Sequence, residues 1–256
     1  MKQISSLFSK AGGILQEKNK TLYTALIQTR TSSKRLKNKV LYQILNEEVF
    51  KIVYKRVLRS KLIKKAIILT TTLKADDKIV KICKKSKILY FRGSSSNVLK
   101  RYYDAAKKFN LQHIVRITSD CPLVDPKVID RICKKYSKKK YHYVSNVLKP
   151  TYPDGYDVEA FNFNTLEKVY RKAKTKFEKE HVTTKMIKDK NIKKLNIKLN
   201  KNYSKFRFTL DTINDYKKIK KIFENEKSIY KPNLKSVLKE AIKKGNYYKT
   251  KRPNYF

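Results

Sequence analysis

The chain has 256 residues, a length that suits one large α/β domain with a sizeable core rather than two full domains. Hydrophobic residues make up 40% of it and aromatic residues 11%, which excludes disorder as the default interpretation. Its 64 Lys and Arg residues against 21 Asp and Glu residues leave a formal charge of +43, so acidic ligands such as nucleotides should be attracted.

The positive charge is spread over nearly every segment of the chain. Compositional drift explains this distribution better than a nucleic-acid surface does, because base recognition usually relies on arginine and clustered charge. We therefore expect no nucleic-acid partner. The three cysteines lack C-x-x-C spacing, which indicates neither a disulfide framework nor a zinc site and fits a reducing compartment. Neither a membrane span nor a signal peptide is indicated, so the sequence predicts a cytoplasmic protein.

The first half of the chain alternates between strand-like and helix-like patterns. Residues 1–20 are predicted to form an N-terminal arm, since serines and glycines interrupt any long periodicity there. One-sided apolar spacing predicts helices at 43–59 and 97–109, the second with Asn97 as N-cap. Continuous apolar runs predict buried strands at 22–27, 67–71, 88–91 and 113–118. This alternation predicts a doubly wound, mostly parallel α/β sheet with right-handed crossovers.

The second half is more mixed. Strands are predicted at 143–145, 158–163 and 206–210, and helices at 164–173, 178–188, after Asn214 and at 233–243. We predict one main domain over 21–228, followed by a C-terminal helix and basic tail over 229–256.

The segment after the first predicted strand, QTRTSSKRLKNK, combines cations with hydroxyl side chains. Ligands of doubly wound sheets bind at the carboxyl ends of the strands, and a triphosphate needs this mixture of donors. The segment matches neither G-x-x-x-x-G-K-S/T nor G-x-G-x-x-G. A solvated lysine-rich turn is the alternative, but its position favours phosphate binding. The predicted nucleotide-binding residues are Gln28, Arg30, Ser32, Ser33, Arg35 and Lys39, with Thr71 after the second strand.

Carboxylates follow two other predicted strands. In RITSDCPLVDP, Asp120 comes directly after a strand, where it is well placed to bind Mg²⁺ that bridges phosphate oxygens, whereas Asp125 before Pro126 is better explained as a helix cap. In FRFTLDTINDY, Asp211 ends a strand, and its alternative role is the N-cap of the next helix. Thr212 competes for that capping role, so the residues alone leave both interpretations of Asp211 open.

Several segments together resemble the cytidylyltransferases of the spore-coat polysaccharide type. The basic loop is similar to the family motif I-Q-A-R-x-G-S-S/T-R-L-P-G-K, although Ser32 replaces its first glycine, Lys34 a small hydroxyl residue, and Lys37 and Asn38 its Pro-Gly. RITSDCPLVDP resembles R-I-T-x-D-C-P-L-I/V-D-P, and RFTLDTINDY resembles R-W-T-V-D-T-x-E-D-F/Y. FRGSSSNVLKRYYDAA, TYPDGYDVEAF and EKEHVT match further family motifs in the same order.

The resemblance implies a nucleotide-diphospho-sugar transferase fold with a Rossmann-like architecture, related to the acylneuraminate and 3-deoxy-manno-octulosonate cytidylyltransferases. It implies a Mg²⁺ ion held by Asp120 and Asp211, with Arg30 and Lys39 also in catalytic roles, and a homodimer. For the acceptor it points to TYPDGYDVEAF and EKEHVT, although a solvent-facing strand edge and a structural histidine are the alternatives. The predicted acceptor-binding residues are Arg116, Tyr152, Asp154, Asp157, Glu159, Glu180 and His181.

The resulting hypothesis is in-line attack by a sugar hydroxyl on the α-phosphate of CTP, which yields a CMP-sugar and pyrophosphate. The acceptor would be a sugar or sugar acid for surface polysaccharide or glycan synthesis. Two alternatives stay open. One is a glycosyltransferase-like nucleotide-sugar enzyme, and the other is a degenerate, non-enzymatic protein that binds polyanions, which stays open because of the Ser32, Lys34 and Lys37 substitutions in the basic loop.

Overall fold

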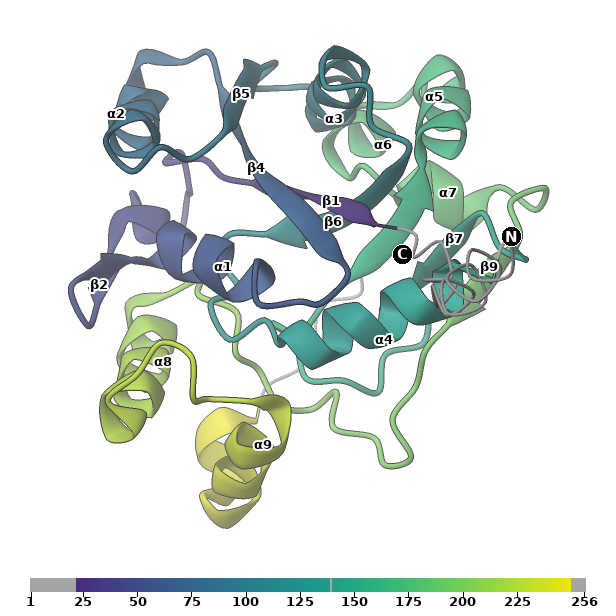
Figure 1. The fold of residues 1–256 in the computed structure, drawn as a ribbon. Helices are drawn as coiled ribbons and strands as arrows, with labels where there is room; N and C mark the ends of the chain where they lie inside the picture. Colours follow the sequence, from purple (N-terminus) through teal and green to yellow (C-terminus); the bar gives the residue numbers. More distant parts are fainter. Residues whose placement is uncertain (1–21, 139, 250–256) are drawn as a thin grey trace, which may run out of the picture.

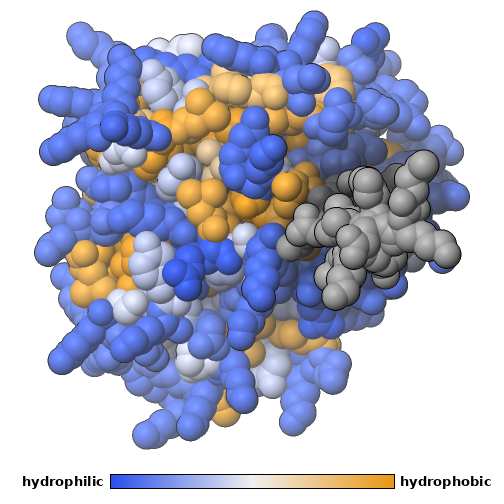
Figure 2. All heavy atoms as spheres, viewed as in Figure 1, coloured by the Kyte–Doolittle hydropathy of each residue, from blue (hydrophilic) through white to orange (hydrophobic). Residues whose placement is uncertain are grey.

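A computed structural model describes residues 22–138 and 140–249. The predicted N-terminal arm and the end of the basic tail lie outside these residues. None of the helices in the described ranges combines the length and the apolar character that a membrane crossing requires. Hydrophilic side chains are spread over the face shown in Figure 2, with hydrophobic side chains visible between them in patches.

A seven-stranded sheet forms the centre of the molecule (Figure 1). The strand order is β5-β4-β1-β6-β8-β7-β9. Parallel pairs join β5, β4, β1 and β6, whereas β8 runs antiparallel to both β6 and β7. The mostly parallel sheet is therefore confirmed. Its strands are β1 (Tyr23–Gln28), β4 (Ile63–Thr71), β5 (Tyr90–Gly93), β6 (His113–Thr118), β7 (Tyr143–Ser145), β8 (Glu159–Asn162) and β9 (Lys194–Asn196).

Helices cover both faces of the sheet, as doubly wound topology requires. Ala25 and Ile27 of β1 belong to the core that contains α1, α2, α4, α8 and α9, whereas Leu26 belongs to the core that contains α3, α5 and α7. Alternate residues of β1 thus face opposite layers. The bounds are α1 (Val49–Val57), α2 (Asp77–Lys85), α3 (Val98–Lys108), α4 (Pro126–Tyr136), α5 (Phe163–Lys172), α6 (Lys176–Glu180), α7 (Thr184–Lys188), α8 (Ile213–Glu226) and α9 (Leu234–Lys243).

The helix predicted at 43–59 begins only at Val49. Two short strands, β2 (Gln43–Ile44) and β3 (Glu47–Glu48), form a hairpin before it. Leu45 and Asn46 between them have φ angles of 49° and 61°, the left-handed conformation that a two-residue hairpin turn requires. The apolar residues Ile44 and Leu45 have the spacing of a helical face, so the pattern wrongly extended the predicted helix back to residue 43.

Two further predictions in the second half are wrong. The helix predicted at 178–188 is split into α6 and α7, because the backbone at His181 is not helical. Residues 206–210 form no regular strand and make only isolated bridges, between Asp154 and Arg207 and between Phe206 and Lys249. Strand β9 was not predicted. The irregular 206–210 segment still leads directly to Asp211.

The predicted C-terminal helix is present as α9 and packs into the same core as α1 and α4. Val237 and Ala241 of α9 are buried in that core, and so is Tyr248 beyond it. The backbone N–H of Leu234 at the start of α9 donates to Asp125 Oδ2 at 2.8 Å. The C-terminal segment thereby holds the end of α4 that lies next to the Asp120 loop.

Candidate active site

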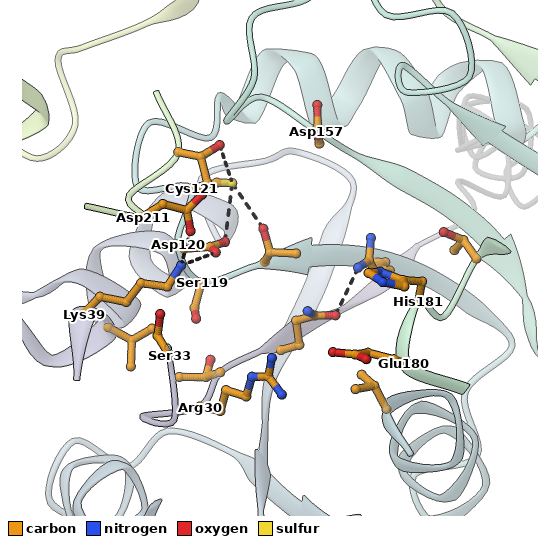
Figure 3. A pocket seen from close by; sticks show the side chains of 18 of the residues that line it. Arg30, Ser33, Lys39, Ser119, Asp120, Cys121, Asp157, Glu180, His181 and Asp211 are labelled. Atoms are coloured by element: carbon orange, nitrogen blue, oxygen red, sulfur yellow. Dashed lines mark hydrogen bonds and ion pairs between the residues drawn. The ribbon is translucent and has the colours of Figure 1, made fainter. Parts of the chain in front are cut away.

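A cavity of about 910 Å³ opens where β1 and β6 end (Figure 3). All but two of the predicted site residues line it. These are Gln28, Arg30, Ser32, Ser33, Arg35, Lys39, Arg116, Asp120, Asp154, Asp157, Glu159, Glu180, His181 and Asp211. The segments after β1 and β6 therefore meet, as the carboxyl-end rule for parallel strands predicts.

Thr71 and Tyr152 do not line the cavity. The Thr71 side chain is fully buried, and its hydroxyl donates to the carboxylate of Asp76. Tyr152 is buried in the core, where its hydroxyl accepts from Arg131 Nη1 at 3.1 Å. Position after a strand or within a motif does not determine which way a side chain points, so these two predicted contacts with ligand lack geometric support.

Asp120 and Asp211 converge on the ammonium group of Lys39. Lys39 Nζ lies 2.7 Å from Asp120 Oδ2 and 2.8 Å from Asp211 Oδ1. Burial lowers the pKa of Lys39, but the two carboxylates outweigh it, so the pKa is raised. Burial raises the pKa of Asp120, but Lys39 and a hydrogen bond from Thr118 outweigh it, so this pKa is lowered. Lys39 and Asp120 are thus charged at neutral pH.

The local folding of three distant segments produces this contact. Asp120 follows β6, and Lys39 begins a short 3₁₀ helix after Asn38, whose φ of 57° places it in the left-handed region. Asparagine tolerates this conformation, so it can replace the family's glycine. The N–H of Leu210 donates to the Asp120 carbonyl at 2.8 Å, which sets Asp211 beside Asp120.

The two carboxylates fit a magnesium ion. They already face one shared cation, and Mg²⁺ in phosphate-transfer sites is bound through one or two carboxylates plus water and substrate phosphates. Residues 22–138 and 140–249 contain no group of three or more His, Cys, Asp or Glu side chains that could hold a metal by themselves. Asp125 takes the predicted capping role instead, because its Oδ1 accepts from the N–H of Lys127 at 2.8 Å.

Asp76 accepts hydrogen bonds from the basic loop after β1. It was not predicted as a site residue. Its Oδ1 accepts from the Thr31 N–H at 2.8 Å and from the Thr31 hydroxyl at 2.6 Å, while Oδ2 accepts from Thr71. Burial raises the pKa of Asp76, but these hydrogen bonds outweigh it, so the pKa is lowered. The sequence signal that could have identified Asp76 is the acidic pair Asp76 and Asp77 after the second predicted strand.

Replacing Asp76 by asparagine should lower the free energy of unfolding by about 1–3 kcal/mol at pH 7, because an amide nitrogen would then face the donors of Thr31 or Thr71. A depressed carboxyl pKa contributes stability above the unfolded value and loses it as pH falls through the folded value. The difference from the native chain should therefore shrink below about pH 4. Urea unfolding at pH 7 and pH 3 measures this. Asp77→Asn is the control, and an equal gap at both pH values would contradict the role.

Arg116 and Glu159, which also line the cavity, form an ion pair in which Glu159 is buried and Arg116 is partly buried. The second carboxylate oxygen of Glu159 accepts from the Tyr143 hydroxyl at 2.8 Å, and Gln28 Oε1 accepts from Arg116 Nη2 at 3.2 Å. Burial lowers the pKa of Arg116, but Glu159 outweighs it, so the pKa is raised. These side chains therefore form a polar floor in which Glu159 and the terminal nitrogens of Arg116 are paired, whereas the Nε of Arg116 has no hydrogen-bond partner within the described residues.

Arg207 joins the segment of Asp154 to the segment of Asp211, and sequence reasoning missed it. Its Nη1 lies 2.6 Å from Asp154 Oδ2, and its other terminal nitrogen contacts Asp211. Thr209 also donates to Asp154 at 2.8 Å. Gly155 has a φ of 103°, and a Cβ there would lie 2.7 Å from the Phe208 carbonyl group, so glycine permits the close approach. Asp154 and Asp211 thus form one ion-paired unit.

Glu180 and His181 lie opposite the Lys39 cluster, on the side of the cavity formed by α6 (Figure 3). Burial lowers the pKa of His181, with Glu180 opposing and nearby arginines adding to the decrease, so the ring is neutral at pH 7. Asp157 lines the same cavity as Glu159, as their alternation predicts. Burial raises the pKa of Cys121 well above its usual value, so this thiol is not an activated nucleophile.

Comparison with known proteins agrees with this geometry. A family model described as cytidylyltransferase matches residues 24–249. An uncharacterized protein of Methanocaldococcus jannaschii is 38% identical over 197 residues, which span 75% of this chain and 79% of that protein. The spore coat polysaccharide biosynthesis protein SpsF of Bacillus subtilis is 29% identical over 209 residues, which span 78% of this chain and 85% of SpsF.

Solved structures show the same fold. A cytidylyltransferase from Leptospira borgpetersenii serovar Hardjo-bovis superposes with a TM-score of 0.83 at 29% identity, over 91% of this chain and 98% of that chain. CMP:2-keto-3-deoxy-manno-octonic acid synthetase complexed with CTP has a TM-score of 0.61 at 13% identity, over 80% of this chain and 99% of that chain. The second likeness concerns the fold alone.

Proposed function

Because this chain belongs to the cytidylyltransferase family, we propose that it transfers CMP from CTP to a hydroxyl of a sugar or sugar acid and releases pyrophosphate. The observation that carries the proposal is the convergence of Asp120, Asp211 and Lys39 at one end of a cavity that also contains Arg30 and Arg35. The name of the Bacillus subtilis relative favours a role in surface polysaccharide synthesis.

The proposed reaction is a single in-line displacement. The acceptor oxygen forms a bond to the α-phosphorus, the bond from that phosphorus to the bridging oxygen breaks, and pyrophosphate leaves while the hydroxyl proton passes to solvent. Lys39, Arg30 and Arg35 offset phosphate charge and hold the triphosphate in place. The unit of Arg207, Asp154 and Asp211 orients the acceptor segment relative to the α-phosphate. Asp157, Glu180 and His181 line the space left for acceptor hydroxyls.

Magnesium belongs to the proposal as the cofactor. Asp120 and Asp211 would hold it, and it would supply charge neutralisation and polarisation of the α-phosphate. A cytoplasmic location and a homodimer stay predictions.

Pyrophosphate release from CTP in the presence of Mg²⁺ and a panel of sugars and sugar acids tests the reaction. A thermal-shift screen of CTP, UTP, ATP and GTP tests the base, since ligand at about 100 times its Kd stabilises the folded chain by about 2.7 kcal/mol. We expect a clear rise in melting temperature with CTP only. Equal shifts with all four triphosphates, or no pyrophosphate with any acceptor, would contradict the proposal.

The pyrophosphate assay, together with a nucleic-acid binding assay at several salt concentrations, separates the two alternatives. A glycosyltransferase-like enzyme would use a nucleotide-sugar and release a nucleotide rather than pyrophosphate. A polyanion-binding protein would bind nucleic acid with a steep dependence on salt and show no metal-dependent response to CTP.

A further inference from the structure

Arg101, on the first turn of α3, is a buried arginine in the wall of the cavity. Its relative exposure is 1%, and it lines the cavity together with Ser95 and Ser96 from the loop before α3. The aliphatic part of its side chain packs on Gly93, where an added Cβ would lie 2.9 Å from Arg101 Cγ. The glycine at the end of β5 therefore leaves the space in which this arginine lies.

The hydrogen bonds of Arg101 are incomplete. Its Nη1 donates to the Ser94 carbonyl at 3.0 Å, but its buried Nε has no partner within residues 22–138 and 140–249. Arg56, which is equally buried, provides the contrast, because its guanidinium donates to four backbone carbonyls. Leaving a buried charged donor unsatisfied is costly, so the Arg101 site lacks an acceptor that its burial requires.

The missing acceptor should carry negative charge. Burial lowers the pKa of Arg101, and repulsion from Arg30, which lines the same cavity, adds to the decrease; the nearby Tyr102 and Asp76 oppose it but do not outweigh it. Two other cations of the cavity are matched by carboxylates, the buried Lys39 by Asp120 and Asp211, and the partly buried Arg116 by Glu159. Arg101 makes no such ion pair with the described residues. A neutral base cannot offset two arginines, whereas a phosphate can.

We propose that Arg101 is a further nucleotide-binding residue, which donates to β- or γ-phosphate oxygens of the nucleoside triphosphate together with Arg30. Arg101 packs on Gly93 at the end of β5, which lies on one side of β1 in the sheet, whereas Asp120 follows β6 on the other side. The proposed function places the α-phosphate at the carboxylate pair, and we place the β- and γ-phosphates on the side where Arg101 and Arg30 supply positive charge. This inference rests on the proposed use of a nucleoside triphosphate.

Isothermal titration of Arg101→Met and Arg101→Lys with CTP, CMP, cytidine and pyrophosphate, each with Mg²⁺, tests the assignment. We expect CTP and pyrophosphate to bind about 10–100-fold more weakly to Arg101→Met, with CMP and cytidine unchanged. Arg101→Lys should recover part of the loss, because lysine keeps the charge but not the planar fork. An equal loss for CTP, CMP and cytidine, or unchanged CTP binding, would overturn the proposal.

Two controls keep the result interpretable. Arg131→Met removes an arginine of α4 that also donates to a backbone carbonyl but does not line the cavity, so its ratio of CTP to CMP affinity should equal that of the native chain. A folding defect in Arg101→Met would weaken CTP and CMP alike, and the comparison within one variant detects it. If the native chain itself fails to bind CTP, the proposed function fails. If the native chain binds CTP and the Arg101 variants bind it with the same affinity, this inference alone fails.

Discussion

Replacing Asp211 by asparagine is expected to lower the rate of pyrophosphate release from CTP by about 100-fold to 1,000-fold, and Asp120→Asn should do the same. Asparagine keeps the size of each side chain but removes the negative charge that a divalent cation requires. Lys39 would then face one carboxylate instead of two, so less of its positive charge would be neutralised.

A Mg²⁺ titration, a double variant and a control variant test this prediction. The rate should be followed against Mg²⁺ concentration, because a lost metal ligand raises the concentration needed for half-maximal rate. The double variant should be little slower than either single variant, since residues that act as one unit are not additive. Asp104→Asn is the matched control, because Asp104 of α3 does not line the cavity and, among the described residues, forms its ion pair with Lys100 of the same helix. Native turnover in either single variant would exclude that carboxylate from metal binding.

Local signals predicted much of the fold. Strand β6 has the predicted bounds, and Asn97 and Asp125 cap α3 and α4 as expected, with side chains that accept from Lys100 and Lys127. Each of these features depends on residues within one element and its flanks. The hairpin at 43–48 depends instead on two left-handed residues, one of them Leu45, that no spacing pattern reveals.

The site divides in the same way. Asp120, Asp211 and the basic loop were predicted because strand ends and family motifs identify them. Asp76, Arg101 and Arg207 were missed, because their roles depend on partners or surroundings that only the folded chain assembles. Thr31 and Asp76 are 45 positions apart, and Asp154 and Arg207 are 53 apart. Motifs identify candidate residues, but the contacts in the folded chain determine their roles.

Replacing Arg56 by methionine is expected to lower the free energy of unfolding by about 3–5 kcal/mol, a large part of the 5–15 kcal/mol typical of a folded domain. Arg56 is 2% exposed. Its guanidinium lies 2.7 Å from both the Ile229 and the Pro232 carbonyls and 3.0 Å from the Val124 carbonyl. It thus ties α1 to the loop before α4 and to the segment before α9.

Methionine can fill much of the space of the arginine stem, so the expected loss comes mainly from carbonyl groups left without donors. Arg56→Lys should recover only a small part, because one ammonium group cannot reproduce the spread of the guanidinium donors. Urea unfolding measures the change, and Arg59→Met on the same segment, whose guanidinium lies over the Tyr230 ring, should cost less than about 1 kcal/mol. A loss below about 1 kcal/mol for Arg56→Met would show that water replaces the arginine.

Because Val124 lies close to Asp120 along the chain, the folded fraction of Arg56→Met should also bind CTP more weakly than the native chain. Arg59→Met should not change CTP binding.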